Sequence, residues 1–508
     1  MHFLCYNLYK LNYTYLHYIY FVFIIPHYSV ESKKFGDPML IGREHELAFL
    51  EKQYRSAGSA MVALYGKRRT GKTELLKRFC ENKRHSFYVC RETTDTEQIR
   101  LFSRKVLESS PLGSYIDSFD TWEKAFNFLL EDSKREKTVL VIDEFPYLVQ
   151  SNPSLPSVLQ NTWDAGHEQS QLMLILTGSA MQTMEQQILS GDSPLFGRTD
   201  GIYRIDELSY QASMQFLGGY SQDHLLTWAT LGGIPRYLKQ FTRGGDYATN
   251  VLENVLSKGA SLYSEVEFLM KYDLREPSTY FAILEALASD CVKIGDISKR
   301  TGLDRTKVNV YLKNLMALDV VRRMLPVTLD PDDPPGPHSS QYGFTNHYIR
   351  FYFRFLYPHF SALEENEAHR VWTEHIQPAL GDFLHDSLIT GARQILLNSN
   401  KNDQLPFVFR QCGTYWDKDT ALDLVATDFD RQLMSILVHT GDHPAGLTEL
   451  DTLRERTALL KKPSHHKHYG LFSLHGFDAN LYELSKLDPA VHLYTFDHLK
   501  TMNSREDD

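Results

Sequence analysis

The stretch Met61-Val-Ala-Leu-Tyr-Gly-Lys-Arg-Arg-Thr-Gly-Lys-Thr73 decides the fold of the first half of this chain. Its apolar run, residues 61–65, is short and continuous, as in a buried strand, and two glycines shape the turn that follows. The segment after the turn has helical spacing, and we expect a helix over residues 73–81. The sequence therefore predicts a strand, a glycine-rich loop and a helix in direct succession.

The loop between this strand and helix suits the phosphate chain of a nucleotide. Gly66 and Gly71 let successive backbone N–H groups point at an anion, and the helix N-terminus adds the positive end of its dipole. Lys72 then reaches the β and γ phosphates, and the Thr73 hydroxyl is a ligand for Mg²⁺. The predicted nucleotide-binding residues of the loop are Gly66, Lys67, Arg68, Arg69, Thr70, Gly71, Lys72 and Thr73.

A second apolar run, residues 138–142, ends in two acids, Asp143 and Glu144. At the tip of a neighbouring strand, Asp143 is placed to hold the metal together with Thr73, and Glu144 to polarise the attacking water. With Lys72, these residues predict a magnesium-dependent nucleoside triphosphatase in which Glu144 and Lys72 are catalytic. The alternative, an ordinary strand-to-helix loop, requires both the motif and its strand context to mislead.

The composition is that of a soluble globular protein with several domains. Of the 508 residues, 42% are hydrophobic and 23% are charged, and such a length corresponds to roughly three to four domains. The net charge of −10 argues against nucleic-acid binding by the chain as a whole. Five scattered cysteines without Cys-x-x-Cys spacing favour a reducing, cytoplasmic setting and no zinc site.

Residues 1–38 differ from the rest because aromatic and aliphatic side chains crowd residues 2–28. The densest part, residues 18–25, is too short to span a bilayer and is stopped by Pro26. A basic start and a small-residue cleavage site, which mark a secretory signal, are not evident. We expect translation to begin at Met39 and the aromatic leader not to be native; a weak membrane anchor is the alternative. Nothing else in the sequence is suited to cross a membrane.

Apolar strands and helices alternate up to residue 205, which predicts an α/β fold with a parallel sheet covered on both faces. The expected strands are residues 61–65, 85–89, 138–142, 172–177 and 202–205. Beyond them, short amphipathic helices over residues 210–217, 224–231 and 237–241 indicate a helical lid. We therefore expect an ATPase core at residues 39–205 and the lid at residues 206–277.

The third region has the pattern of a winged helix-turn-helix at residues 278–345. Helices are expected over residues 280–287 and 294–301, and a turn at Gly302 precedes a third helix that Asp304 is suited to cap. A strand over residues 320–327 and a returning strand complete the wing. The fourth region, residues 346–508, opens with an aromatic run that we interpret as a buried helix face.

Six short motifs occur in the order found in one protein family. They are Ile41-Gly-Arg-Glu44, the loop at 66–73, Ile142-Asp-Glu-Phe-Pro146, Leu176-Thr-Gly-Ser179, Pro194-Leu-Phe-Gly-Arg198 and Gly232-Gly-Ile-Pro-Arg-Tyr-Leu238. In these motifs the chain resembles the archaeal-type AAA+ ATPase family, which is related to the STAND signalling ATPases, over about residues 39–350. The remainder resembles the C-terminal domain of that family, which is similar to PD-(D/E)XK nucleases.

The resemblance implies roles for four further residues. Thr177 and Ser179 lie where such folds place a polar sensor of the γ-phosphate; simple capping of the strand is the alternative. Arg198 corresponds to an arginine finger offered to a neighbouring nucleotide, which requires a homo-oligomer, whereas the alternative is a surface arginine. Arg236, in the lid, is placed to contact the phosphates.

Basic residues outnumber acidic ones in the region of the expected winged helix, against the trend of the chain. Because the first turns of a recognition helix enter the major groove, this region predicts contact with double-stranded DNA. An alternative role as a protein-interaction or autoinhibitory module remains open. The residues expected to contact DNA are Arg305, Lys307, Asn309, Lys313, Arg322 and Arg323.

The nuclease-like region departs from the pattern that its family needs for magnesium. His385 stands where a glutamate is expected, and Ala421 replaces the acidic residue before Asp423. The next strand, residues 435–440, contains no Glu-x-Lys. Since a single carboxylate cannot assemble a magnesium site of this kind, we predict a restriction-endonuclease-like α/β domain without nuclease activity.

These features predict a cytoplasmic AAA+ type ATPase that binds ATP and Mg²⁺, forms a homo-oligomer and couples nucleotide state to the winged helix. Two alternatives remain. One is a STAND-like nucleotide switch that hydrolyses slowly and regulates a protein partner. The other is a transcriptional regulator in which ATP gates DNA binding. No membrane partner is expected.

Overall fold

The computed structural model describes residues 40–110, 115–242, 244–274, 277–330, 332, 334–336, 339–430, 432–460 and 466–497. The expectation that residues 1–38 are not native lies outside these ranges. Among the described residues, none of the helices combines the length and the apolar character that a bilayer crossing requires.

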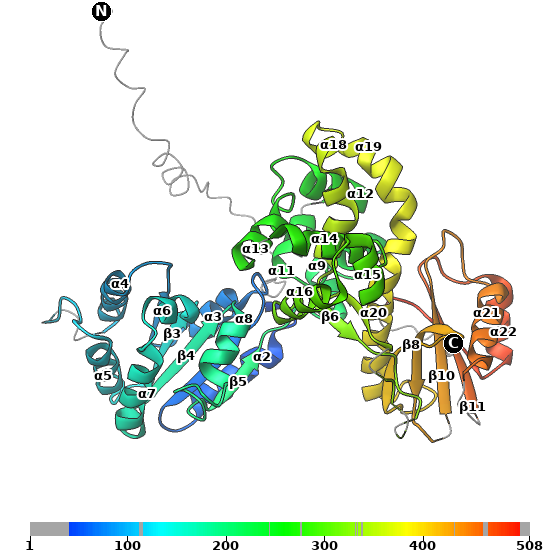
Figure 1. Ribbon diagram of the computed structural model, residues 1–508. Coiled ribbons are helices and arrows are strands. Elements are labelled where there is room, and N and C mark those ends of the chain that lie inside the picture. The colour runs from blue at the N-terminus through cyan, green and yellow to red at the C-terminus, as the bar shows by residue number, and fades with distance from the viewer. Residues whose placement is uncertain are drawn as a thin grey trace, which may run out of the picture. The chain divides into compact units, whose positions relative to one another are not determined.

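The first sheet is parallel throughout (Figure 1) and has the strand order β2-β3-β4-β1-β5. Strand β4 therefore lies between β1, which leads into the glycine-rich loop, and β3, which ends in Asp143. The strands are β1 Ala60–Tyr65, β2 His85–Val89, β3 Thr138–Asp143, β4 Leu172–Gly178 and β5 Gly201–Arg204. The predicted strands and the parallel α/β core are confirmed, with every strand end within one residue of its expected place.

Alternating side chains of β1 enter two apolar cores, because successive residues of a strand point to opposite faces. Met61 and Ala63 share a core with α4 Asp95–Glu108, α5 Trp122–Asp132 and α7 Leu155–Gly166. Val62 and Leu64 share another with α2 Glu44–Arg55 and α3 Lys72–Cys80. Burying one side chain of leucine size stabilises the fold by about 1.5–3 kcal/mol. Both faces are covered, so the carboxyl ends of the strands are left for a site.

The lid is helical, as predicted. Helices α9 and α10 begin where Ser209 and Ser221 accept hydrogen bonds from backbone N–H groups of the first turn. The third expected helix begins two residues early, at Pro235, because proline fits the first helical turn. The bounds are α9 Tyr210–Leu217, α10 Gln222–Leu231, α11 Pro235–Leu238, α12 Tyr247–Val251 and α13 Glu265–Asp273.

Three helices and a hairpin follow the lid, and we call them the three-helix unit. They are α14 Pro277–Ala288, α15 Ile294–Thr301, α16 Arg305–Ala317, and the antiparallel strands β6 Val321–Met324 and β7 Gln341–Phe344. Asp304 caps α16 by accepting a hydrogen bond from the Lys307 N–H at 2.9 Å, as expected. Strand β6 is shorter than predicted, since Pro326 has no N–H for a ladder; Val327 instead donates to the Thr414 carbonyl at 2.8 Å.

The C-terminal region contains a mixed sheet behind the long helix α20 Leu380–Lys401. Its order is β12-β11-β10-β9-β8, in which β8, β9 and β10 pair antiparallel and β10, β11 and β12 pair parallel. The elements are β8 Gln411–Trp416, β9 Ala421–Thr427, β10 Gln432–His439, α21 Leu447–Ala458, β11 His466–Ser473, α22 Ala479–Leu487 and β12 Val491–Tyr494.

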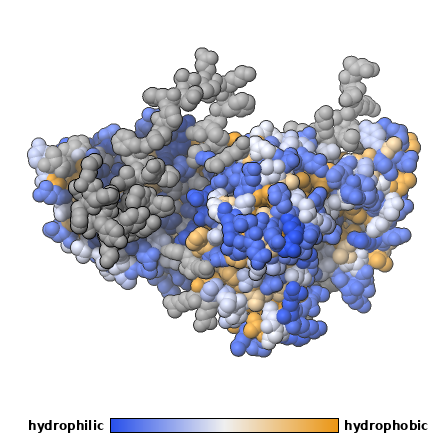
Figure 2. Space-filling model, turned by 90° about the horizontal axis from the view of Figure 1, so that it is seen from above, coloured by the Kyte–Doolittle hydropathy of each residue, from blue (hydrophilic) through white to orange (hydrophobic). Residues whose placement is uncertain are grey.

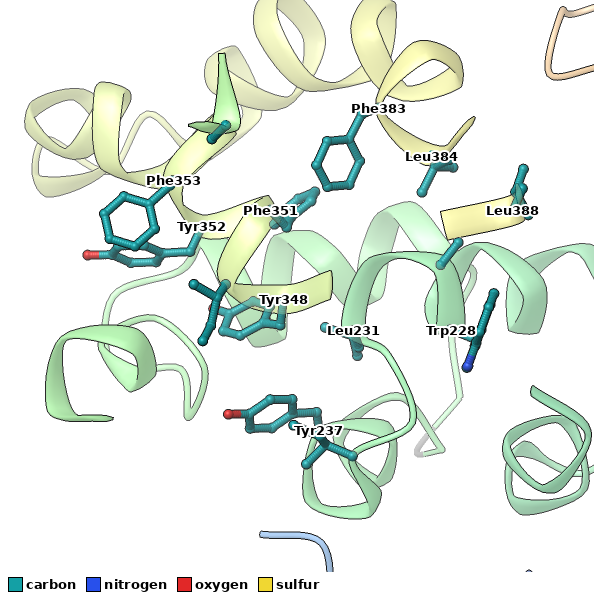
Figure 3. Packing of buried hydrophobic residues seen from close by; sticks show 14 of the residues in the cluster. Trp228, Leu231, Tyr237, Tyr348, Phe351, Tyr352, Phe353, Phe383, Leu384 and Leu388 are labelled. Atoms are coloured by element: carbon teal, nitrogen blue, oxygen red, sulfur yellow. The ribbon is translucent and has the colours of Figure 1, made fainter. Parts of the chain in front are cut away.

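One apolar cluster joins the lid, the three-helix unit and the C-terminal region. The predicted aromatic helix face is confirmed: Tyr348, Phe351, Tyr352 and Phe353 are fully buried, on α17 His347–Phe351 and the π-helical turn after it. Figure 3 shows Tyr348 next to Tyr237 of the lid, and Trp228 of the lid on the side of Leu388. On the face seen in Figure 2, the described surface is mainly hydrophilic with small, separate hydrophobic patches. These three regions therefore share one apolar cluster, whereas the first sheet has two clusters of its own and the C-terminal region has a further one.

Candidate nucleotide site and its partners in the chain

The glycine-rich loop between β1 and α3 has the backbone that a phosphate cradle needs. A side chain at Gly66 would meet the Ile205 carbonyl oxygen at 2.2 Å, and Gly71 has a φ of 92°. Lys72 is 6% exposed and donates to the carbonyls of Gly66 and Lys67 at 2.7 and 2.8 Å. Burial lowers the pKa of Lys72 to about 8. The Lys72 ammonium is thus hydrogen-bonded to the loop, at the place where a phosphate would accept its hydrogen bonds.

Asp143 and Thr73 meet at the end of β3, although they are far apart in sequence. The Thr73 hydroxyl donates to Asp143 Oδ2 at 2.9 Å, and Asp143 is 3% exposed. Burial raises the pKa of Asp143, and the bond from Thr73 opposes the rise. A hydroxyl and a carboxylate in contact beside the phosphate loop are the oxygen ligands that Mg²⁺ uses with nucleotides. The two residues therefore fit the predicted metal.

Glu144 is held by Ser179, from the end of β4. The Ser179 hydroxyl donates to both carboxylate oxygens of Glu144, at 2.8 and 2.9 Å, and its N–H donates to Oε2 at 3.1 Å. Glu144 has a positive φ of 56°, which is uncommon for a residue with a side chain. Thr177 is fully buried, and its hydroxyl finds no hydrogen-bond partner among the described residues. Of the two expected sensors, Ser179 is the one that touches the predicted base.

Arg69 turns away from the cradle and toward the lid. Its guanidinium forms an ion pair with Glu265, the first residue of α13, whose side chain is 2% exposed. Tyr237 of α11 donates to the other oxygen of Glu265 at 2.8 Å. Burial, together with the charges of Arg236 and Arg68, lowers the pKa of Arg69. Arg236 is exposed and close enough to act on Arg69 through its charge, on the lid side as expected.

Lys67 connects the same loop to the three-helix unit. Its ammonium lies 3.2 Å from carboxylate oxygens of both Asp319 and Glu207, and 3.4 Å from the Thr345 hydroxyl. Asp319 follows α16 and also pairs with Arg204 at 2.9 Å. A cavity of about 340 Å³ opens beside these groups, lined among others by Lys67, Arg68, Ser179, Tyr237, Met270 and Asp319. The loop, the lid and the three-helix unit therefore converge on one space.

Arg198, the expected arginine finger, is bound within its own chain. It makes a two-pronged ion pair with Asp164 of α7, with Nε to Oδ1 at 2.9 Å and Nη2 to Oδ2 at 2.7 Å. It also donates to the carbonyl of Pro194 at 3.1 Å. The hydrogen bonds that Arg198 donates to Asp164 raise the pKa of Arg198. A role toward a neighbouring nucleotide requires this pair to open.

The residues expected to contact DNA divide into two sets. On α16, Arg305, Lys307 and Lys313 are exposed and Asn309 is partly exposed. Arg323 on β6 is exposed as well, and its Nε donates to the Ser340 hydroxyl at 2.7 Å. Arg322 is exposed too, but it also lines cavities of about 530 and 190 Å³ that α20 helps to form. Its pKa is lowered by burial and by the charge of Arg393. On α16 the expected residues are thus open to solvent, whereas Arg322 faces cavities that α20 helps to form.

The residues of the predicted inactive nuclease site do come together. His385 Nε2 on α20 lies 3.4 Å from Asp423 Oδ2 on β9, and the Val438 N–H donates to the same oxygen at 2.7 Å. Burial alone lowers the pKa of His385, but the hydrogen bond and charge of Asp423, helped by Asp386, leave it raised. An imidazole therefore lies beside Asp423, and it belongs to His385, the residue at which a glutamate was expected from the sequence.

Two residues that the structure places beside the loop, Glu265 and Asp319, could not be predicted from the sequence. Each stands in a helical region without a motif. Only a local excess of basic residues in the loop, three in a row from Lys67 to Arg69, indicated that acidic partners were required.

The comparisons with known proteins agree with this geometry. A model described as an ATPase domain predominantly from Archaea matches residues 40–241, and one of archaeal and bacterial proteins of unknown function matches residues 352–438. An uncharacterised protein of Methanocaldococcus jannaschii is 31% identical over 407 residues, which cover 80% of this chain and 88% of that relative. A short protein of the same organism, described as ATP-binding, is 44% identical over 50 residues, 10% of this chain and 85% of its own length.

Among solved structures, a Walker-type ATPase of Pyrococcus abyssi is similar, with 20% identity and a TM-score of 0.47, over 62% of this chain and 96% of that one. The ORC2 protein of Aeropyrum pernix is 14% identical with a TM-score of 0.41, over 65% and 94% of the two chains. The fold and the loop define a P-loop nucleotide-binding protein. The relative of 31% identity and the matched ATPase domain show that the chain belongs to this archaeal ATPase family.

Proposed function

We propose that this protein is a magnesium-dependent ATPase whose phosphate loop controls a DNA-binding winged helix, the three-helix unit. The observation that carries the proposal is the contact of Lys67 with Asp319 at 3.2 Å, because it joins a loop residue directly to the end of α16. A bound nucleotide brings negative phosphates to the loop and competes with Asp319 for the Lys67 ammonium. Nucleotide state is thereby communicated to α16.

In the proposed reaction each residue of the site has one task. Lys72 and the loop amides bind the phosphates, while Thr73 and Asp143 hold Mg²⁺, which supplies charge neutralisation when bound. Glu144 accepts a proton from the attacking water, and Ser179 positions its carboxylate. Arg198 neutralises developing charge on a nucleotide of a neighbouring subunit once it leaves Asp164.

The DNA surface proposed here is formed by exposed basic residues of α16. Arg305, Lys307 and Lys313 are exposed on this helix and supply positive charge for DNA phosphates. Arg322 is left out of this surface because it lines the cavities beside α20. Double-stranded DNA binding that weakens with salt and falls in Lys307→Ala, but not in Arg322→Gln, is the expected result.

The deciding experiment is steady-state ATP hydrolysis with and without double-stranded DNA. We expect DNA to stimulate hydrolysis by the wild type, and Asp319→Asn to hydrolyse ATP without responding to DNA. Asp296→Asn is the matched control, since it removes the same charge from an exposed position of the same unit. Wild-type hydrolysis that ignores DNA contradicts the DNA-coupled function.

A second function is favoured by one observation, the neutralisation of Lys67 and Arg69 by carboxylates of the same chain. Such pairs suit a STAND-like switch, in which nucleotide occupancy rather than turnover sets the conformation and a protein partner reads it. Nucleotide that copurifies with the protein, with hydrolysis that DNA does not stimulate, supports the switch. ATP-dependent DNA affinity without stimulated turnover supports the gated transcriptional regulator.

For the C-terminal region we propose a nuclease-like fold without nuclease activity. Asp423 is paired with His385 in place of a second acid, so the carboxylates that a magnesium site needs are not assembled around it. We expect no magnesium-dependent DNA cleavage. Cleavage that Asp423→Ala abolishes contradicts the proposal.

A further inference from the structure

A buried carboxylate beside the phosphate loop has no place in the reaction just described. Glu265 is 2% exposed and begins α13 in the lid. It accepts a hydrogen bond from Tyr237 and forms an ion pair with Arg69 of the loop. A buried carboxylate depends strongly on its partners, because the charge has lost its hydration. The stability of the α13 start is therefore tied to the position of one loop arginine.

Arg69 in turn lies among like charges. Arg236 and Arg68 both lower its pKa, and Glu265 is the acid with which it pairs. A triphosphate bound at the loop would bring several negative charges into this group of arginines. Since a carboxylate and a phosphate are both acceptors for the same guanidinium fork, they compete for it.

We infer that Glu265 is a positioning residue that holds Arg69 in the absence of nucleotide and releases it when phosphates bind, with α13 as the element that moves. This inference rests on the proposed nucleotide site. The contacts of Glu265 indicate why α13 responds: once Arg69 leaves, the carboxylate keeps only the Tyr237 hydroxyl and must reach water. Tyr237 itself stays fixed, packed edge-on against Tyr348 at 5.4 Å (Figure 3).

Movement of α13 would change the shape of the cavity beside the phosphate loop. Leu269 and Met270 of α13 line the cavity of about 340 Å³ that Lys67, Arg68 and Ser179 also line. Displacement of α13 changes the wall opposite the loop, so release of Glu265 alters the space next to the predicted γ-phosphate position. By linkage, whatever strengthens the Arg69–Glu265 pair must weaken nucleotide binding, and the reverse.

The test is the affinity of the full-length protein for fluorescent ATP and ADP analogues. Glu265→Gln removes the competing charge, and we expect the Kd to fall at least about fivefold. Tyr237→Phe keeps the charge but removes the other donor, so Glu265 relies more on Arg69 and the Kd should rise. Opposite shifts from two substitutions at one contact are not expected from simple loss of structure.

Glu364→Gln is the matched control. Glu364 also accepts a hydrogen bond from a tyrosine, Tyr263, and pairs with a lysine, Lys258, but Glu364 and Lys258 lie outside the loop and the lid cavity. We expect its Kd to match the wild type. Hydrogen exchange gives a second readout. In the wild type, the α13 amides should exchange faster when nucleotide is added. In Glu265→Gln, they should exchange at that faster rate even without nucleotide.

The outcomes separate the two proposals. Wild-type protein that binds no ATP analogue contradicts the nucleotide site itself. Wild-type protein that binds normally, with an unchanged Kd in Glu265→Gln or an equal change in Glu364→Gln, overturns the role of Glu265 alone. Exchange at α13 that ignores nucleotide overturns it as well.

Discussion

The hydroxyl of Ser179 lies 2.8 and 2.9 Å from the two carboxylate oxygens of Glu144. The contact joins the ends of neighbouring parallel strands, β4 and β3, and it fixes the carboxylate of the proposed general base. Glu144 follows its strand with a φ of 56°, and Ser179 donates hydrogen bonds to both of its carboxylate oxygens. Its orientation depends on Ser179.

Ser179→Ala should therefore lower kcat for ATP hydrolysis without changing nucleotide affinity. A base that is no longer held in the productive geometry loses about tenfold or more in rate. Steady-state kinetics beside equilibrium binding separate the two quantities. Glu144→Gln sets the lower limit, since an amide cannot accept the proton and general-base catalysis supplies about 10²–10⁴-fold. A Ser179→Ala protein with wild-type kcat contradicts the positioning role.

A substitution at Thr177 should stabilise the protein, whereas most substitutions in a core destabilise it. Its buried hydroxyl lacks a partner among the described residues, and an unsatisfied buried polar group costs about 1–3 kcal/mol. Thr177→Val keeps the shape and removes the hydroxyl, so the free energy of unfolding should increase by about 1 kcal/mol. Denaturant unfolding measures it. A decrease in stability, or a loss of hydrolysis, indicates that the hydroxyl has a partner in the working enzyme.

Substitutions of Arg198 and Asp164 distinguish a catalytic role of Arg198 from a structural role of the ion pair. If Arg198 acts on a neighbouring nucleotide, Arg198→Ala abolishes hydrolysis, whereas Asp164→Asn only frees the arginine and leaves hydrolysis equal to or faster than the wild type. The specific activity of the wild type should then rise with protein concentration as subunits associate. Equal losses in both variants mean that the 2.7 Å ion pair is structural.

His347 predicts a pH dependence of stability. Its Nδ1 lies 3.2 Å from the Trp228 carbonyl, and burial lowers its pKa from 6.5 to about 4. Because the unfolded chain takes up the proton first, stability is complete above pH 6.5 and is lost as the pH falls toward 4. Between pH 7.5 and 5 the loss from this group should be about 2 kcal/mol.

His347→Asn tests this prediction, since an amide can donate to the same carbonyl and does not titrate. Urea unfolding at both pH values should show a smaller loss for the variant than for the wild type. His475→Asn, at an exposed position, is the control and should keep the wild-type slope. If His347→Asn loses as much unfolding free energy between the two pH values as the wild type, other groups determine the loss of stability at low pH.

The sequence was sufficient for the elements whose signals are local. A continuous apolar run before Gly66 is buried on both faces and can only be a central strand, and the acids after residue 142 must then stand at the same sheet edge. The same holds for the cap of α16 at Asp304. The bounds of β6 were predicted less well. The apolar pattern extends over residues 320–327, but Pro326 has no N–H to donate to a neighbouring strand, so the strand ends earlier.

The tertiary structure decided which carboxylates form ion pairs with the cations of the phosphate loop. Nothing near Arg69 in the sequence selects Glu265 over the phosphates, and Lys67 contacts Thr345 across 278 positions of the chain. Such pairs depend on the tertiary fold, in which one apolar cluster holds the lid and the three-helix unit together. Local residue patterns determined the chemistry of the site because strands, turns and caps are short-range. The pairing of the loop cations Lys67 and Arg69 with Asp319 and Glu265 was decided by packing, since only packing brings carboxylates so distant in the sequence within reach of the loop.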